Sequence, residues 1–424
     1  MKLFNSDSFT YRNKKLFCDN VPVESIAKEF GTPVYIYSKK FFTEKYKEFS
    51  EAFSEINHRI FFASKSNFNL NVIKIFADLG AGIDVNSAGE LYRAKKAGVA
   101  PSDMLFSGVG KTAEEIKEAI ENGVLILKAE SLGEAHLINK LAGELGKKAP
   151  IAFRVNPDVN PETHPYISTG LAENKFGISS EDTISIFKEA AALPNLDVCG
   201  IDMHIGSQIT TISPYIEAVQ KMADIFLYIK NEGIGLKHFD IGGGMGIIYN
   251  NETPFTPKQL AEKLIPIFKK LDCEILFEPG RSLTANGGIL LTEVLYTKSN
   301  NQKNFIVVDA AMTDLLRPSI YKAYHHIQPE EIFNREDIIA DIVGPVCESG
   351  DFLAKSRTIT KCEPKELMAV MSAGAYGMVM SSNYNARRRP PEIIVDGDKY
   401  FCTRNRENFE HLLFDETIVD ELHG

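Results

Sequence analysis

The sequence has no long apolar run and no excess of positive charge. None of its 424 residues lies in an uninterrupted apolar stretch of the roughly 18 residues that a transmembrane helix needs. The first residues lack a basic segment followed by an apolar one, so no secretory leader is expected. A net charge of -10 disfavours nucleic acid or an anionic membrane as a partner. We therefore expect a soluble, cytoplasmic protein.

Cysteine is scarce and scattered. The chain has six cysteines, with no CxxC pair and no His/Cys spacing of the kind that binds a metal. A disulfide scaffold and a zinc site are both unexpected, and we expect no metal. The cysteines are interpreted as reduced thiols, most of them in the core: Cys18, Cys199, Cys273, Cys347, Cys362 and Cys402.

Strand-like and helical segments alternate through the first two thirds of the chain. Length alone suggests about two or three domains. Eight apolar runs alternate with amphipathic helical segments, which favours a (β/α)8 TIM barrel. An open doubly wound sheet would alternate in the same way, but the number of strands favours the barrel. The expected strands are 59–63, 82–86, 104–107, 124–128, 151–155, 198–204, 237–241 and 274–278.

Beyond residue 285 the pattern becomes that of hairpins. Residues 289–298 and 304–309 flank one turn, and 393–395 and 400–403 flank another. Residues 8–18 also alternate like a hairpin. We expect a barrel domain over 37–285 and a separate, discontinuous all-β domain, sandwich- or barrel-like, that contributes to the active site and is formed by 1–36 and 286–424.

Unusual residues recur at the ends of the expected barrel strands. Lys65 follows the first strand, Asp84 lies near the end of the second and His204 ends the sixth. Gly242–Gly244 follows the seventh strand, and Glu278 closes the eighth. Each has an ordinary explanation alone: a solvated lysine, a satisfied core histidine or a flexible turn. Because TIM barrels hold reactive residues where strands end, their coincidence favours an active site.

These groups suit pyridoxal phosphate (PLP). A lysine in a polar pocket has a lowered pKa and can attack an aldehyde. Glycine amides, with the Ser207 hydroxyl, would bind the phosphate. A flat histidine would stack on the ring, and a carboxylate would keep the ring nitrogen protonated, so that the ring can accept an electron pair.

Seven motifs cover nearly the whole chain, and as a set they are far more specific than any one alone. They are Ala63–Asn67, His204–Gln208, Gly242–Gly244, Glu278–Arg281, Leu316–Tyr321, Gly344–Asp351 and Gly374–Gly377. The set resembles the diaminopimelate decarboxylases, PLP-dependent enzymes of the alanine-racemase-like fold. The resemblance implies decarboxylation of meso-diaminopimelate to L-lysine and carbon dioxide, the last step of lysine biosynthesis.

The resemblance also implies roles in the barrel. Lys65 would form the Schiff base with the cofactor, His204 would stack on the ring and Glu278 would pair with the pyridine nitrogen. Asp84 would support the site near His204 or Lys65. The remaining cofactor-binding residues, mostly around the phosphate, would be Ser207, Gly243, Gly244, Gly280, Arg281 and Tyr376.

Further implied roles concern the substrate. Arg281, Arg317 and Tyr321, with Tyr376, would bind the distal carboxylate end, since guanidinium groups pair with carboxylates in bidentate fashion. Glu348 would bind the distal ammonium, and Cys347 would protonate the carbanion. In this family the Cys347–Glu348 loop enters the active site of a second subunit, which implies a homodimer with shared active sites. Residues 160–176, long for a strand-to-helix loop, are predicted to act as a lid.

Three alternatives remain at this point. A decarboxylase of ornithine, lysine, arginine or carboxynorspermidine would not need the distal clamp of Arg281, Arg317, Tyr321 and Glu348. A racemase would use a second base instead of the Cys347–Glu348 loop. A non-enzymatic PLP-binding homologue would have lost Lys65 or Cys347.

Overall fold

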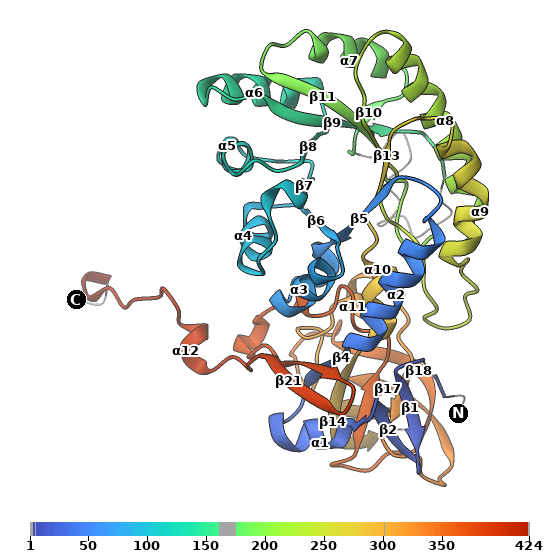
Figure 1. Ribbon diagram of the computed structural model, residues 1–424. Helices are drawn as coiled ribbons and strands as arrows, with labels where there is room; N and C mark the ends of the chain where they lie inside the picture. Colours follow the sequence, from blue (N-terminus) through green and yellow to red (C-terminus); the bar gives the residue numbers. More distant parts are fainter. Residues whose placement is uncertain (1–2, 5, 161–174, 301, 423–424) are drawn as a thin grey trace. The chain divides into compact units, whose positions relative to one another are not determined.

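The computed structural model describes residues 3–4, 6–160, 175–300 and 302–422 (Figure 1). Two compact units are present: Phe41–Asn286 forms one, and Met1–Lys40 together with Gly287–Gly424 forms the other. Among the described helices, none combines the length and the apolar character needed to cross a membrane. The predicted lid, residues 160–176, lies mostly outside the described residues.

The first unit is a closed barrel of eight parallel strands. Its strands are β5 (His58–Ala63), β6 (Gly82–Val85), β7 (Met104–Phe106), β8 (Ile126–Ala129), β9 (Ala149–Asn156), β11 (Leu196–Asp202), β12 (His238–Asp240) and β13 (Glu274–Phe277). The pairing of β13 with β5 closes the ring, which confirms the barrel and excludes an open sheet. All eight expected strands are present. A short extra strand, β10 (Ile178–Ser179), pairs with β9 and was not expected.

Helices surround the barrel in Figure 1, as the alternating pattern predicts. They are α2 (Lys39–Ala52), α3 (Leu70–Asp78), α4 (Ala88–Lys96), α5 (Ala113–Asn122), α6 (Leu132–Glu144), α7 (Thr183–Ala191), α8 (Ser213–Asn231), α9 (Pro257–Phe268) and α10 (Arg281–Thr284). Capping boxes begin α5 at Thr112 and α9 at Thr256. Apolar helix faces pack on the strands: the Phe76 ring of α3 stacks on Phe62 of β5 with centroids 4.2 Å apart.

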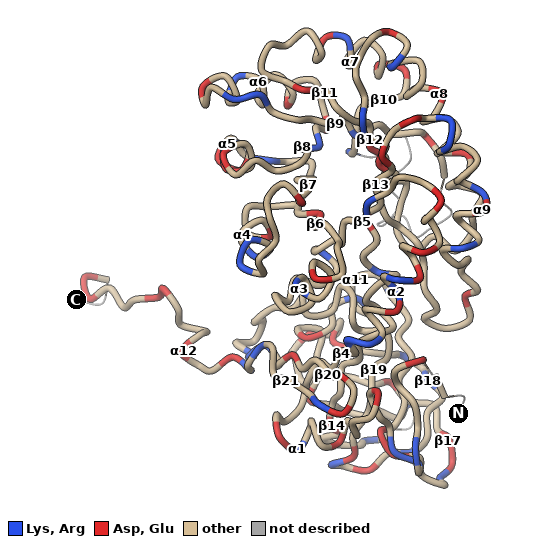
Figure 2. The backbone as a smooth tube through the Cα atoms, viewed as in Figure 1, with Lys and Arg blue, Asp and Glu red and all other residues tan. Residues whose placement is uncertain are grey.

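A layer of small and large apolar side chains fills the barrel interior. The members of this cluster are Phe61, Leu105, Ile126, Ala152, Cys199 and Leu276, all nearly inaccessible. Gly82 leaves the space for Phe61, because a Cβ at Gly82 would collide with that ring. Since side chains of a strand alternate between its two faces, residues two positions beyond this layer also face the interior. Figure 2 marks charged residues on the strands as well as on the helices.

The second unit is built on a mixed sheet in the order β18-β17-β15-β14-β4-β20-β21, with β16 and β19 paired alongside β14. The bounds are β4 (Val34–Ser38), β14 (Gly288–Ser299), β15 (Asn304–Val308), β16 (Ile327–Pro329), β17 (Asp337–Val343), β18 (Phe352–Thr360), β19 (Leu367–Val370), β20 (Glu392–Asp396) and β21 (Lys399–Arg404). A second, three-stranded sheet contains β1 (Phe9–Arg12), β2 (Lys15–Cys18) and β3 (Val21–Pro22). The short helices are α1 (Val23–Phe30), α11 (Arg317–Tyr321) and α12 (Phe409–Leu412).

All three expected hairpins of this unit are present. Strands β1 and β2 pair antiparallel, as do β14 and β15, and β20 and β21. Strand β4 was not expected, and it lies between β14 and β20, antiparallel to one and parallel to the other. Its five buried residues come from the N-terminal segment, so this sheet is completed by chain regions far apart in sequence.

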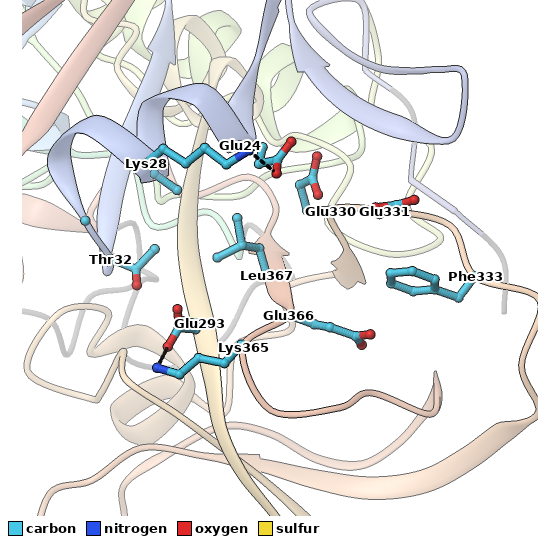
Figure 3. Close-up of a pocket in the computed structure, with 12 residues that line it drawn as sticks. Glu24, Lys28, Thr32, Glu293, Glu330, Glu331, Phe333, Lys365, Glu366 and Leu367 are labelled. Carbon is cyan, nitrogen blue, oxygen red and sulfur yellow. Dashed lines mark hydrogen bonds and ion pairs between the residues drawn. The ribbon is translucent and has the colours of Figure 1, made fainter.

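A cavity of about 370 Å³ in the second unit is rich in glutamates (Figure 3). Glu24, the first of them, pairs with Lys15 at 2.5 Å and with Lys28 at 2.6 Å. Glu330 differs: it is 5% exposed, and its Oε1 has no hydrogen-bond partner among the described residues. Burial, followed by the charges of nearby glutamates, raises the pKa of Glu330 to about 7. Glu330 therefore titrates near neutrality.

We expect the Glu330→Gln variant to unfold a few degrees above the wild type at pH 8 and close to it at pH 5. The folded carboxyl keeps its proton up to about pH 7, whereas the unfolded one ionises near its ordinary value of 4.5. The unfolded state binds fewer protons in that window, so the free energy of unfolding falls as pH rises through it. Thermal unfolding followed by circular dichroism measures the difference. Glu331→Gln, at a more exposed position in the same cavity, is the control, and equal midpoints for Glu330→Gln and wild type at pH 8 would contradict the assignment.

Candidate active site

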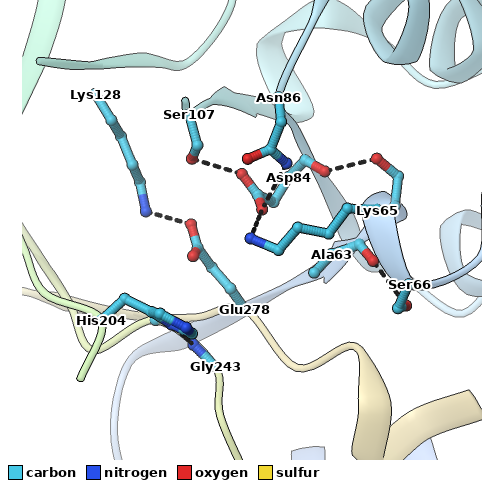
Figure 4. Close-up of polar contacts among 12 residues, drawn as sticks. Ala63, Lys65, Ser66, Asp84, Asn86, Ser107, Lys128, His204, Gly243 and Glu278 are labelled. Carbon is cyan, nitrogen blue, oxygen red and sulfur yellow. Dashed lines mark hydrogen bonds and ion pairs between the residues drawn. The ribbon is translucent and has the colours of Figure 1, made fainter. Parts of the chain in front are cut away.

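The carboxyl ends of the barrel strands gather ionisable side chains at one mouth (Figure 4). Lys65 follows β5 in a short 3-10 turn, and Asp84 lies on β6. Lys128 lies on β8, and Glu278 directly follows β13. Lys128 and Glu278 each stand two residues beyond a member of the apolar layer, so both side chains face the interior.

Lys65 is accessible and lies beside a buried carboxyl. Its Nζ is 3.7 Å from Oδ2 of Asp84, and the Lys65 side chain is 38% exposed while that of Asp84 is inaccessible. The Ser107 hydroxyl donates to Oδ1 of Asp84 at 2.6 Å. Burial, together with the Glu278 charge, raises the pKa of Asp84 to about 7. Asp84 can thus hold a proton near neutral pH next to the Lys65 amine.

Lys128 has an entirely different environment. Its ammonium donates to Oδ1 of Asp202 at 2.8 Å, to Oδ2 of Asp240 at 2.7 Å and to Oε1 of Glu278. Burial acts to lower the pKa of Lys128, but the three carboxylates outweigh it and raise that pKa well above the ordinary value. A protonated amine whose three donors are all used is no nucleophile. Of these two lysines, Lys65 is the one suited to attack an aldehyde.

Glu278 is a buried carboxylate that stays ionised. Burial acts to raise its pKa, and the charges of Lys128 and Lys65 overcome this, so that its pKa lies below the ordinary value. A buried anion of this kind can pair with a protonated ring nitrogen.

His204 follows β11 as a neutral ring. Its Nδ1 accepts a hydrogen bond from the Gly243 N–H at 3.3 Å. Burial, followed by the positive charges of Arg154, Lys65 and Lys128, holds the pKa of His204 well below its ordinary value. An uncharged, oriented imidazole is suited to stack on a flat ring.

The triple glycine is packed too tightly for any side chain. Gly242 and Gly244 have φ of 69° and 113°, in the range that favours glycine. A Cβ at Gly243 would collide with the Glu278 carbonyl oxygen. The Tyr215 hydroxyl donates to the Gly243 carbonyl at 2.7 Å, which fixes the loop. The backbone is therefore held in the close-approach geometry of a phosphate-binding loop.

Arg281, Ser207 and Gly280 are also placed at this rim. Arg281 is buried, and its guanidinium donates to Ser207 Oγ at 2.8 Å and to the Tyr249 hydroxyl at 2.7 Å. A Cβ at Gly280 would approach Ser66 Oγ to 2.9 Å, so any side chain there would have to displace Ser66. The hydrogen bond joins two predicted residues, Ser207 and Arg281, through side chains from different loops.

Sequence reasoning missed several residues of this mouth. Arg154 on β9 donates to Glu130 Oε1 at 3.2 Å and to the His204 carbonyl at 3.3 Å, so it holds the backbone of His204 in place. Lys128 and Tyr249 were also missed. The available signal was charge inside an apolar strand: Lys128 interrupts the otherwise apolar run 124–129, and Arg154 interrupts 151–155.

The other predicted residues belong to the second unit. Arg317 begins α11 and Tyr321 ends it. The Arg317 guanidinium lies 2.7 Å from Nε2 of His325, whose Nδ1 lies 2.9 Å from the Met371 carbonyl oxygen. His325 is fully buried and was not predicted; as a neutral ring it accepts from the guanidinium and thus orients it. Tyr376 stands in a loop with φ of 55°.

Cys347 and Glu348 lie in the turn between β17 and β18. The Asp351 carboxylate accepts from the Val346 N–H at 2.7 Å, which shapes this turn. The Ser319 hydroxyl of α11 donates to the Gly350 carbonyl at 2.6 Å. This bond ties the helix of Arg317 and Tyr321 to the turn of Cys347 and Glu348. The Cys347 side chain is exposed.

The barrel mouth fits pyridoxal phosphate on its own chemistry. It offers an accessible amine at Lys65 and an ionised buried carboxylate at Glu278. It also has a neutral ring at His204 and a glycine backbone that any Cβ would obstruct. These are the groups that bind an aldehyde, a pyridine nitrogen, an aromatic ring and a phosphate.

Comparison with known proteins gives the same assignment. Residues 39–285 match the family model of the pyridoxal-dependent decarboxylase, pyridoxal binding domain. The chain is 46% identical to diaminopimelate decarboxylase of Aquifex aeolicus, with 95% of this chain and 96% of the relative covered. It is 45% identical to that of Haemophilus influenzae, covering 97% and 99%.

Solved structures extend the likeness to the fold. Diaminopimelate decarboxylase from Helicobacter pylori, complexed with L-lysine, superposes with a TM-score of 0.89 at 40% identity, covering 92% of this chain and 98% of that chain. The enzyme from M. jannaschii, in complex with L-lysine, gives 0.93 at 37% identity, covering 98% and 99%. This chain therefore belongs to the diaminopimelate decarboxylases, within the pyridoxal-dependent decarboxylase family.

Proposed function

We propose that this protein removes the carboxylate at the D-configured carbon of meso-diaminopimelate and releases carbon dioxide and L-lysine. The observation that carries the proposal is that one barrel mouth holds both an accessible lysine, Lys65, and a buried, ionised carboxylate, Glu278. The near full-length identity to diaminopimelate decarboxylases supports the choice of substrate.

Pyridoxal phosphate, when bound, supplies a ring that accepts the electron pair left at Cα when the carboxylate departs. The chain's own residues hold and orient it. The Lys65 amine would bond to the aldehyde, and the Glu278 carboxylate would hold the proton on the ring nitrogen. His204 would cover one face of the ring, while the amides of Gly243 and Gly244 would bind the phosphate. We include Ser207, Gly280 and Tyr376 in the phosphate site, and Asp84 as a support for Lys65.

Four residues would recognise the distal end of the substrate. Arg281, Arg317 and Tyr321 would bind its carboxylate, and Glu348 would bind its ammonium. The geometry of Arg317 supports this role, because His325 holds the guanidinium in one orientation. A substrate without the distal carboxylate would lose its charge-assisted hydrogen bonds to the two guanidinium groups, which is a strong source of discrimination.

Cys347 would finish the reaction by donating its thiol proton to Cα. Its exposed position in the β17–β18 turn supports transfer to a site outside its own unit. We propose that this site belongs to a second copy of the chain, in a homodimer with shared active sites. The C-terminal segment supports self-association, since its large apolar residues are exposed: Phe409, Leu413, Phe414, Ile418 and Leu422. We also propose a cytoplasmic location, which fits six cysteines that are all free thiols.

Substrate choice is tested by measuring carbon dioxide release from meso-diaminopimelate, L-lysine and L-ornithine with purified, PLP-loaded protein. We expect release from meso-diaminopimelate at least about a hundredfold faster than from the other two, because only this substrate satisfies the distal clamp. Faster release from ornithine would assign the protein to another decarboxylase specificity. No release from any of the three would contradict enzymatic function.

The role of Cys347 is tested by the Cys347→Ala variant. We expect turnover of meso-diaminopimelate to fall by about a hundredfold or more, because a general acid is lost, while the visible absorption of the bound cofactor is retained. Cys402→Ala is the matched control, since Cys402 is another exposed cysteine of the same unit. Equal turnover in both variants would remove Cys347 as the proton donor.

Shared active sites predict complementation between two inactive variants. Lys65→Ala and Cys347→Ala would each be inactive alone, but a mixed dimer contains one site with both native residues. After mixing and subunit exchange, about a quarter of the wild-type activity per chain is expected, because half of the dimers are mixed and each has one intact site. Activity that stays at the level of the separate variants after proven exchange would show that each site uses its own cysteine.

A further inference from the structure

Four charged side chains form a closed cluster beneath the barrel mouth. Lys128 occupies its centre, and Asp202, Asp240 and Glu278 surround the ammonium. The four side chains are between 2% and 6% exposed. An ammonium has three N–H donors, and here each donor meets a different carboxylate. Lys128 is thus fully coordinated by side chains from three other strands or strand ends.

The three carboxylates compete for this one cation. Their ligand oxygens all lie within 4.8 Å of one another, a distance at which like charges repel strongly when buried. Burial is the largest cause that raises the pKa of Asp202 and of Asp240, and the charge of Glu278 raises both further. Only the pKa of Glu278 lies below its ordinary value. The cluster therefore favours the ionised form of Glu278 over the ionised form of either aspartate.

Other charged groups around Glu278 also affect ionisation in the mouth. The positive charges of Lys65 and Arg154 favour the ionised form of Glu278, while the charge of Glu278 raises the pKa of buried Asp84, because like charges repel. Lys128 is the positive group that contacts Glu278 directly, and of the surrounding charges it lowers the pKa of Glu278 the most. The charged groups that interact electrostatically with Glu278 are Lys65 after β5, Asp84 on β6, Lys128 on β8, Arg154 on β9, Asp202 on β11 and Asp240 on β12. His204, after β11, is a further titratable side chain of the same mouth (Figure 4).

The contact also orients the carboxylate. Among the described residues, hydrogen bonds to the Glu278 side chain reach Oε1 alone, and Lys128 makes that bond. Figure 4 shows Glu278 between Lys128 on one side and the Lys65–Asp84 pair on the other. Lys128 thus engages one oxygen, and Oε2 is left for a ligand in the mouth.

We propose that Lys128 is a positioning residue that fixes Glu278 through Oε1, keeps it ionised and directs Oε2 to the pyridine nitrogen of the cofactor. Asp202 and Asp240 anchor the ammonium so that it cannot turn toward the ligand. The inference rests on the proposed function, because Glu278 meets a pyridine nitrogen only when pyridoxal phosphate is bound. The charged cluster would thus act on the reaction through the ring nitrogen and not through the reacting carbon.

The test is the protonation of the ring nitrogen in holoenzyme loaded with 15N-labelled pyridoxal phosphate. In the wild type, we expect the 15N chemical shift of a protonated pyridine at pH 7.5. In Lys128→Met, the shift is expected to move to that of the unprotonated ring, because the unpaired Glu278 takes up a proton. The kcat for meso-diaminopimelate should fall by about tenfold or more, with KM changed much less.

Lys111→Met is the matched control for loss of a buried ammonium. Lys111 is 1% exposed, donates to the backbone carbonyls of Gly108 and Lys128 at 2.6 Å each, and forms an ion pair with Glu134 at 2.7 Å. Its replacement removes a buried ammonium that lies beside the backbone of Lys128 but leaves the Lys128 ammonium itself in place. Its variant should retain the wild-type 15N shift. Lys128→Gln is the second variant, since glutamine can still donate a hydrogen bond to Glu278 but has no charge; we expect the same change of shift as in Lys128→Met.

Each outcome is decisive. An unchanged 15N shift in a folded Lys128 variant would overturn the inference, as would the same change in Lys111→Met. If both Lys128 variants fail to fold while Lys111→Met folds, Lys128 serves folding instead of the cofactor, and the inference is wrong. If the wild type itself does not bind pyridoxal phosphate, the proposed function fails, and this is distinguishable because no 15N signal of bound cofactor would appear.

Discussion

The buried ion cluster centred on Lys128 is the interaction on which the barrel mouth depends. Taking three carboxylates and one ammonium out of water is costly, and the arrangement is stable only because every donor of the ammonium has an acceptor. Closure of the barrel is what makes this possible, since it brings β8, β11, β12 and β13 around one axis. The apolar layer below the cluster separates it from solvent at the other end of the barrel. Removal of one partner would leave an uncompensated buried charge.

The cluster explains why Lys128 and Lys65 differ in chemical behaviour. Lys128 is buried, saturated with acceptors and permanently charged, so it can set the state of Glu278 but cannot react. Lys65 is accessible and lies beside Asp84, whose pKa near 7 allows proton exchange at neutral pH. The same residue type is therefore a fixed charge at one strand end and, in our proposal, a nucleophile at another. The difference in burial between the two side chains, 2% exposed for Lys128 and 38% for Lys65, decides which role each can take.

The sequence predicted the barrel better than the interior of its mouth. Eight strands followed from alternation of apolar runs, and the reactive rim followed from residues such as Lys65 and Glu278 at strand ends. Strand β4 was missed because its partners, β14 and β20, lie more than two hundred residues further along the chain, and nothing local indicates such pairing. The partners of Lys128 are 74, 112 and 150 residues away, so its role could not be seen in its own short apolar run. The His325 contact that orients Arg317 was likewise invisible, because a buried neutral histidine has no sequence signature.

The central claim is that Lys65, and not Lys128, bonds to the cofactor. Borohydride reduction of the PLP-loaded protein fixes the cofactor onto the lysine that holds it, and peptide mass spectrometry then locates the modified residue. The account predicts that the phosphopyridoxyl group is found on the peptide containing Lys65 and that Lys128 is unmodified. Modification of Lys128, or of neither lysine, would contradict it.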